Sequence, residues 1–585
     1  MKKLHIALLC LFSLSTLPIL ATDPPITRKD RGEVRLSVGV GGATPWDASI
    51  RYDFGNAKYR LSPFFAINGT HRHNTATRED IDLTYTGIMP LSETANHQYL
   101  STESLRTRGG AISYGADFQF KPSASDQIEA GLKLESDATN TVGSRTEQVF
   151  LNSGSEAQPG QRHLSQFVPS SYDGSDALYS LEATAGYTHT FQGSNWFMLG
   201  GKLDLRYSYL LSDDGHERRQ TVLPGASYPG REDFDLQVWP TTQKHRLQLD
   251  ILTPYITLLP IHIGAFYENR LMDSRDEQWS GQEKTLDDYF RHRYQTGGAY
   301  LKADWSAGRF KFNAKLEYDY TRMRALVEEQ SKSRSLNDFV PELGVLWSMG
   351  KGHSLQASYV RRIIRPSLEL LNPAEIHSTY TLSYGNPDLI GAHINNLSLR
   401  YQLKRDKVDF STTLMHISAN DGFNAIWMER GLARIYTWGN EGKRRAWSLT
   451  PDATWRPAKT TALHARLNVI WDKREAEAIH MAKEHWGFTT AADLTQTLPA
   501  DILLKVNGEY SEGNTIDLYS HAGRQYSYGA SLQRKLIPSG RLIGVLSYSH
   551  FDAPKTIITQ GAYVGSIYLR ARHKDAGTLT LTYKF

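Results

Sequence analysis

A strict alternation of apolar and polar side chains runs through residues 308–320, whose sequence is GRFKFNAKLEYDY. Aromatic and aliphatic residues occupy every second position, and charged or amide residues occupy the positions between them. Because successive side chains of a β-strand point to opposite faces, this segment predicts a strand with one apolar and one charged face. A fold that contains it must supply an apolar surrounding on one side and water on the other.

The same two-residue period recurs along most of the chain, and helical periodicity is nearly absent. We therefore expect an all-β protein. The final residues, GTLTLTYKF, belong to this pattern and place Leu579, Leu581, Tyr583 and Phe585 on one face. Further segments with the period are 34–40, 111–120, 127–135, 181–191, 202–210, 407–417 and 462–471.

The connections between these segments alternate between short turns and long polar stretches. Short turns at one rim and long loops at the other are typical of bacterial outer-membrane barrels, whose short turns face the periplasm. We therefore predict a transmembrane antiparallel β-barrel of about 22 strands. The short turns are 121–126, 192–195, 306–309, 349–352, 404–406 and 456–459. The long stretches are roughly 71–108, 137–176, 211–243, 271–293 and 365–391.

The beginning of the chain has the pattern of a secretory signal peptide: two lysines, a short apolar stretch and a small residue at Ala21. We expect residues 1–21 to be this signal, 22–32 a short N-terminal segment, and 33–585 a barrel in the cell outer membrane. The one cysteine, Cys10, lies in the signal. The mature chain would then contain no disulfide, zinc-thiolate site or cysteine nucleophile.

Composition agrees with a membrane barrel and argues against other classes. Beyond the signal no apolar run reaches the roughly 18 residues of a membrane helix, and the negative mean hydropathy fits strands whose alternate side chains face a wet lumen. The aromatic content of 11% suits girdles at the two membrane interfaces. A soluble propeller would show a fixed repeat, which we do not find. With 66 basic and 62 acidic residues, no nucleic-acid partner is indicated.

A set of residues in the second half carries a family resemblance. Proline after Arg or Asn favours extended or turn backbone, so we interpret the set as loop architecture. Its members are Arg365, Pro366, Asn372, Pro373, Gly385, Asn386, Pro387 and Leu389. With segments 435–455 and 485–513, this order resembles the outer-membrane barrel of Bacteroidetes-type TonB-dependent receptor-like proteins. The resemblance covers residues 340–585 best.

The resemblance implies uptake or passage of a solute or peptide across the outer membrane. Receptors of this type carry a plug domain before the barrel, whereas strand-like alternation here starts at Val34. We therefore expect a barrel without a plug. A barrel this wide would leave a large aqueous hole, so we expect inward-folding loops, residues 71–108 and 137–176 foremost, or another chain to fill it.

No catalytic, cofactor or metal site is expected. His71 and His73 would share one strand face, but no second ligand pair accompanies them. His292 stands between Arg291 and Arg293, whose positive charges disfavour a cation. The motifs of serine hydrolases, zinc proteases and nucleotide-binding loops are absent, so we expect no enzyme activity. Ligand-binding residues are not identified, although the mixed stretches 75–87 and 216–239 are typical of binding loops.

The expected partners follow from the barrel. A last strand that ends on Phe585 resembles the signal read by the barrel-assembly machinery, and outer-membrane lipid would surround the wall. A surface lipoprotein or a separate plug protein would be a further partner. Besides uptake, an alternative function stays open: a structural subunit that anchors a multiprotein complex in the outer membrane.

Overall fold

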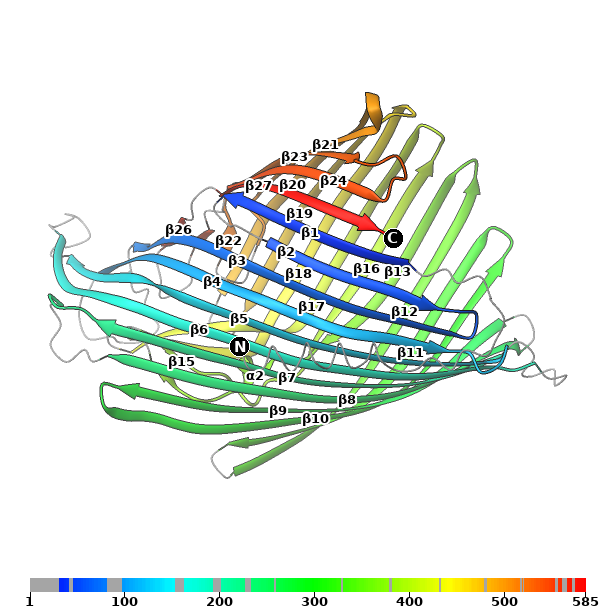
Figure 1. Ribbon diagram of the computed structural model, residues 1–585. Coiled ribbons are helices and arrows are strands. Elements are labelled where there is room, and N and C mark those ends of the chain that lie inside the picture. Colours follow the sequence, from blue (N-terminus) through cyan, green and yellow to red (C-terminus); the bar gives the residue numbers. More distant parts are fainter. Residues whose placement is uncertain are drawn as a thin grey trace, which may run out of the picture.

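Twenty-two strands of the computed structural model pair as antiparallel neighbours in chain order and close into a barrel (Figure 1). The prediction of an antiparallel barrel of about 22 strands is confirmed. No helix among the described residues is long and apolar enough to cross a membrane. The structure describes residues 31–41, 46–81, 97–152, 162–192, 201–226, 233–256, 259–327, 330–377, 381–430, 433–477, 481–515, 518, 520–552, 556–559, 566–570 and 574–585.

The elements have the following bounds. The barrel strands are β1 (Arg31–Gly41), β2 (Trp46–Gly55), β3 (Tyr59–Ile81), β4 (His97–Phe120), β5 (Asp126–Asn152), β6 (Arg162–Thr190), β7 (Lys202–Val222), β8 (Phe234–Ile256), β9 (Leu259–Ser280), β10 (Glu283–Ala307), β11 (Phe310–Val327), β12 (Gln330–Gly350), β13 (His353–Ile364), β16 (Ala392–Lys404), β17 (Val408–Arg430), β18 (Ala433–Ala458), β19 (Thr461–Ala476), β20 (Met481–Leu498), β21 (Ile502–Glu512), β23 (Gln525–Lys535), β24 (Leu542–Asp552) and β27 (Lys574–Lys584). Shorter elements in the connections are α2 (Leu368–Leu371), β14 (Ile376–His377), β15 (Thr381–Ser383), η2 (Pro499–Asp501), β22 (Ser520–Ala522), β25 (Thr556–Thr559) and β26 (Ser566–Arg570).

The first and last strands close the barrel. Figure 1 shows the red β27 beside the blue β1, and their register pairs Glu33 with Lys584 and Gly41 with Ala576. At the end of the seam, the backbone amides and carbonyls of Gly32 and Phe585 form two hydrogen bonds of 3.0 Å. The four residues expected on one face of the last strand are all exposed on the outside: Leu579, Leu581, Tyr583 and Phe585.

Strand β11 shows how the alternation divides the two faces. Leu316, Tyr318 and Tyr320 are 44%, 52% and 47% exposed on the outer face. Lys315 and Asp319 point to the inside, where Asp319 is buried. The apolar side chains therefore meet lipid, and the charged ones line the lumen.

The predicted short turns 121–126, 306–309, 349–352, 404–406 and 456–459 join successive strands at one rim. In the turn between β10 and β11, Gly308 has a φ of 59°, a conformation that glycine adopts without steric cost. The remaining predicted turn, 192–195, lies mostly outside the described residues.

The long extracellular connections consist largely of strand. Residues 271–293, for example, belong to β9 and β10 except for a two-residue turn. On β10 the outward side chains change from Leu301 and Ala299 to Arg293 and Arg291. The apolar band ends between these pairs, so the hairpin continues into the water beyond the membrane.

The expectation that residues 71–108 and 137–176 fold into the lumen is wrong for their described parts. These residues form β3, β4, β5 and β6, which remain in the wall because their backbone groups pair with neighbouring strands. Residues 82–96 and 153–161 lie outside the described residues, as do residues 1–30, on which the predicted signal peptide falls. Strand β1 begins at Arg31, close to the expected start of the barrel.

Candidate functional site in the barrel lumen

Residues 365–391 connect β13 with β16, and their described parts, 365–377 and 381–391, pack against the inner wall of the barrel. We call this segment the lumenal loop. Burying a leucine stabilises by about 1.5–3 kcal/mol, so the leucines of the loop hold it firmly against β9, β10 and β11. The contact cluster comprises Leu368, Leu371 and Leu389 of the loop and Met272, Phe290, Tyr294, Met323 and Ala325 of the wall.

The sequence of the loop limits its helix to a single turn. Asn372 precedes Pro373, and a residue before proline is pushed away from helical backbone. Asn372 accordingly has φ −70° and ψ 113°, and α2 ends there. The turn that remains directs Leu368 and Leu371 toward the wall, where both are buried.

Arg365 anchors the start of the loop to β11. Its guanidinium Nη2 donates a 3.0 Å hydrogen bond to Thr321 Oγ1 and lies 3.7 Å from Asp319 Oδ2. Both partners are buried on the inner face of the wall. A charged pair that is shielded from water holds its geometry more firmly than an exposed one.

Asp276 anchors the end of α2 to β9, beyond the apolar band. The side-chain amide of Asn372 donates a hydrogen bond to its Oδ2, and Ser274 Oγ donates one of 2.6 Å to its Oδ1. Burial raises the pKa of Asp276, and the hydrogen bonds from Ser274 and Asn372 oppose that rise. The carboxyl group therefore serves to hold the end of α2 against β9.

The other end of the loop is attached to β18 by two asparagines, Asn386 of the loop and Asn440 of the strand. Asn386 Nδ2 donates a 2.9 Å hydrogen bond to the carbonyl of Trp438. Ile390 and Asn440 exchange two hydrogen bonds, of 2.8 Å and 3.1 Å, between backbone and side-chain amide. Since β9 and β18 are seven strands apart in the barrel order, the lumenal loop spans a chord of the lumen.

Gly385 is packed so closely that no larger residue fits. An added Cβ would lie 2.6 Å from both the backbone nitrogen and the oxygen of Asn372, and 2.7 Å from the Leu370 oxygen. The Gly385 amide also donates a 2.6 Å hydrogen bond to the Asn372 carbonyl. The glycine permits the two arms of the loop to touch.

We expect Gly385→Ala to lower the stability of the lumenal loop by about 1–3 kcal/mol, because the new methyl group would overpack against backbone. Limited proteolysis of the folded protein should then cut between residues 365 and 391 faster than in the unmodified protein. Gly297→Ala is the matched control, since a Cβ there meets nothing within 4 Å. Equal cleavage rates in the two variants would contradict this packing.

A cavity of about 510 Å³ lies between the loop and the wall on the extracellular side of the lumen. Its lining combines the apolar Met323 and Leu389 with the cations Lys332 and Arg334. Lys332 Nζ and Arg334 Nη1 each donate a 3.3 Å hydrogen bond to Asp388, to the carboxylate and the backbone carbonyl respectively. The cavity therefore offers an apolar surface beside a positively charged rim.

His292 lines the same cavity and is buried. Burial, and then the positive charge of Arg270, lower the pKa of His292 to about 4. The imidazole is therefore neutral at neutral pH and can act as a hydrogen-bonding group. In the described parts of the chain, no cluster of three or more His, Cys, Asp or Glu residues could hold a metal ion.

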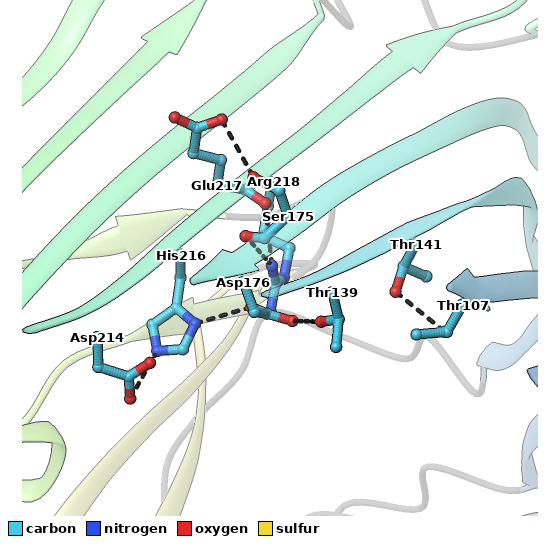
Figure 2. A network of polar contacts seen from close by, with 9 residues as sticks. All are labelled: Thr107, Thr139, Thr141, Ser175, Asp176, Asp214, His216, Glu217 and Arg218. Atoms are coloured by element: carbon cyan, nitrogen blue, oxygen red, sulfur yellow. Dashed lines mark hydrogen bonds and ion pairs between the residues drawn. The ribbon is translucent and has the colours of Figure 1, made fainter. Parts of the chain in front are cut away.

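A second polar group lies on the inner face of β5, β6 and β7 (Figure 2). Asp176 is its centre: Arg218 Nη2 and His216 Nδ1 lie 2.5 Å and 2.8 Å from its Oδ1, and Thr139 donates a 3.2 Å hydrogen bond to its Oδ2. Asp214 Oδ2 lies 3.4 Å from the other nitrogen of His216. The group places charges of both signs on the lumen surface.

The partners of Asp176 also lower the pKa of its carboxyl group. Burial acts to raise its pKa, but the hydrogen bonds and positive charges of His216 and Arg218 outweigh burial and hold the pKa below its usual range. Ser175 projects to the opposite face of β6, where its hydroxyl donates a 3.2 Å hydrogen bond to Glu217. The serine and the histidine are thus on different sides of the sheet.

Sequence comparison assigns the barrel to a family. The profile of the outer membrane protein beta-barrel family matches residues 198–542, which is more than half of the chain. The chain belongs to this family. No curated protein matches its sequence significantly.

Solved structures show that this family member shares the fold of larger outer-membrane receptors. The ferric yersiniabactin uptake receptor FyuA from Yersinia pestis superimposes with a TM-score of 0.61 at 11% identity, covering 97% of this chain and 81% of that one. The copper transporter OprC gives 0.62 at 11% identity, with 96% and 84% covered. The siderophore receptor PirA from Pseudomonas aeruginosa gives 0.57 at 11% identity, with 96% and 82% covered.

The structure brings together the eight residues singled out in the sequence. All of them, from Arg365 to Leu389, lie in the lumenal loop of this outer-membrane barrel. His71 and His73 lie in β3, but their side chains are outside the described part. Of the two mixed stretches, residues 75–81 and most of 216–239 continue the wall.

Sequence reasoning missed the partners of the loop. Asp276, Thr321 and Asn440 hold it through side-chain hydrogen bonds. The sequence around them is polar, as it is around other residues that face the lumen. No local signal distinguishes them, because each partner lies 44 or more residues away in the chain.

Proposed function

We propose that this barrel admits a solute or peptide through its lumen, and that the lumenal loop restricts the passage in place of a plug domain. The observation that carries the proposal is the chord from β9 to β18, anchored by Asp276 at one end and Asn440 at the other. A loop that crosses a wide barrel reduces the open cross-section of its lumen.

The lining of the lumen supports a polar cargo. Lys244 and Arg246 both reach Glu268 at 3.2 Å, and Lys315 lies 2.5 Å from Glu317. Such pairs keep charge of both signs along the path, as expected for a surface that contacts hydrated solutes. The shared fold with a siderophore receptor and a copper transporter agrees with transport.

The cavity beside the lumenal loop is a candidate contact point for the cargo. It is open to the extracellular half of the lumen, and its rim carries Lys332 and Arg334. An apolar floor with a cationic rim suits an organic solute that bears an acidic group.

Release from liposomes tests the proposal. Purified protein in liposomes that contain an anionic dye and a graded series of peptides should release the dye and small peptides but retain the large ones. Liposomes without protein provide the baseline. If nothing is released and the membrane-purified protein carries a stoichiometric protein partner, the passage function is rejected and the structural-subunit alternative is favoured.

A further inference from the structure

Three arginines stand together on the outer face of the barrel, immediately beyond the apolar band. Arg322 and Arg324 of β11 follow Tyr318 and Tyr320 on the lipid-facing side. Arg293 of β10 lies beside them, and all three arginines are exposed. We call them the outer arginine cluster. At about 3.3 Å of rise per residue, Arg322 lies about 7 Å of strand beyond Tyr320.

The register places like charges opposite one another. Arg293 is the direct cross-strand partner of Arg324, and Arg322 faces Gln295 on the same strand pair. Directly opposed like charges destabilise a sheet. An anion between the side chains would convert this repulsion into attraction.

Neighbouring outward arginines already have carboxylate partners. Arg219 lies 2.6 Å from Asp235, Arg275 2.9 Å from Glu277, and Arg291 2.5 Å from Asp273. For the outer arginine cluster, no carboxylate of the described residues lies within ion-pairing distance. Within the described part of the chain, the positive charge of the cluster is thus left for an external anion.

Two of the guanidinium groups are held in place by neutral partners. Arg293 Nε donates a 2.8 Å hydrogen bond to Asn269 Oδ1, and Arg324 Nε donates one of 2.8 Å to Ser331 Oγ. These bonds use one nitrogen of each fork and leave the terminal nitrogens free to bind oxygen. Arginine forks bind phosphate in a bidentate manner more readily than lysine does.

We propose that the outer arginine cluster binds the phosphate groups of outer-leaflet lipid. The aromatic side chains beneath it mark the membrane interface, so the cluster lies at the depth of the lipid head groups. Basic clusters at that depth recognise anionic head groups. The site would fix one phosphorylated lipid at the β10–β11 wall.

Native mass spectrometry of the detergent-purified barrel with added lipid A tests the site. The triple variant Arg293→Gln, Arg322→Gln, Arg324→Gln should bind diphosphoryl lipid A roughly tenfold more weakly than the unmodified protein. A change of this size corresponds to the loss of about one strong charge-assisted hydrogen bond. Lipid A stripped of phosphate should bind the two proteins equally. The control carries glutamine at Lys302, Lys311 and Lys315, three inward-facing cations of β10 and β11, and should bind like the unmodified protein.

Two results would overturn the proposal. One is equal binding of diphosphoryl lipid A by the triple variant and the unmodified protein, with both shown to be folded by heat-modifiable migration. The other is displacement of the lipid by millimolar inorganic phosphate, which would identify a site for free phosphate. If the triple variant does not fold, Arg324→Gln alone provides the comparison, with a smaller expected loss.

Discussion

Replacing residues 365–391 with a short turn is expected to raise the single-channel conductance of the reconstituted barrel several-fold. Ile364 is the cross-strand partner of Ala392, so a tight turn can join β13 directly to β16 without moving the wall. The replacement removes the chord across the lumen. Planar bilayer recordings at fixed salt measure the result.

A graded variant separates this effect from damage to the barrel. Asn440→Ala removes both hydrogen bonds to Ile390 but leaves the β9 anchor in place, so we expect a smaller rise in conductance with more frequent fluctuations. Gly297→Ala should not change conductance. If the protein without the loop conducts no better than the unmodified protein, the loop does not restrict the lumen.

Leu316→Arg is expected to reduce the yield of assembled barrel strongly. Leu316 faces lipid in β11, between Leu301 and Pro341 of the neighbouring strands. An arginine near the middle of the apolar band costs about 2–4 kcal/mol. The fraction of folded, heat-modifiable protein in outer-membrane preparations measures the loss.

Lys315→Leu, one residue away, is the control. Lys315 faces the lumen, where its ammonium group lies 2.5 Å from Glu317 and 4.8 Å from the centre of the Tyr300 ring. Its loss removes one partly shielded ion pair, whose side chains are 26% and 13% exposed, from a wet lumen surface. Such a pair contributes little, so assembly should stay near normal. Equal yields from the two variants would refute the assignment of faces.

The sequence was sufficient to predict the membrane part of the wall. In β11 every second residue is apolar from Phe310 to Tyr320, and this alternation fixes the face that each side chain occupies. The predicted turn at 306–309 also holds, since polar residues and Gly308 break the pattern there.

The alternation disappears where the wall leaves the membrane. In residues 271–293 the outer face meets water, so charged residues such as Asp273 and Arg291 can point outward. The inner face keeps apolar residues such as Met272 and Phe290 only where it packs against the lumenal loop. The segment therefore looked like a loop although it is a continuous hairpin of β9 and β10. The lumenal loop was unpredictable for a related reason: Asn372 and its partner Asp276 are 96 residues apart.

The pairing of β1 with β27 has a consequence for biogenesis. Ser37 and Thr580, whose hydroxyls are 3.0 Å apart, are separated by 543 positions in the chain. The cylinder cannot close before the ribosome has delivered the C-terminus, and every partial sheet has two open edges whose amides and carbonyls lack partners. Loss of β27 would thus leave a gap in the wall, because β24 and β1 would both lose the strand that pairs with them.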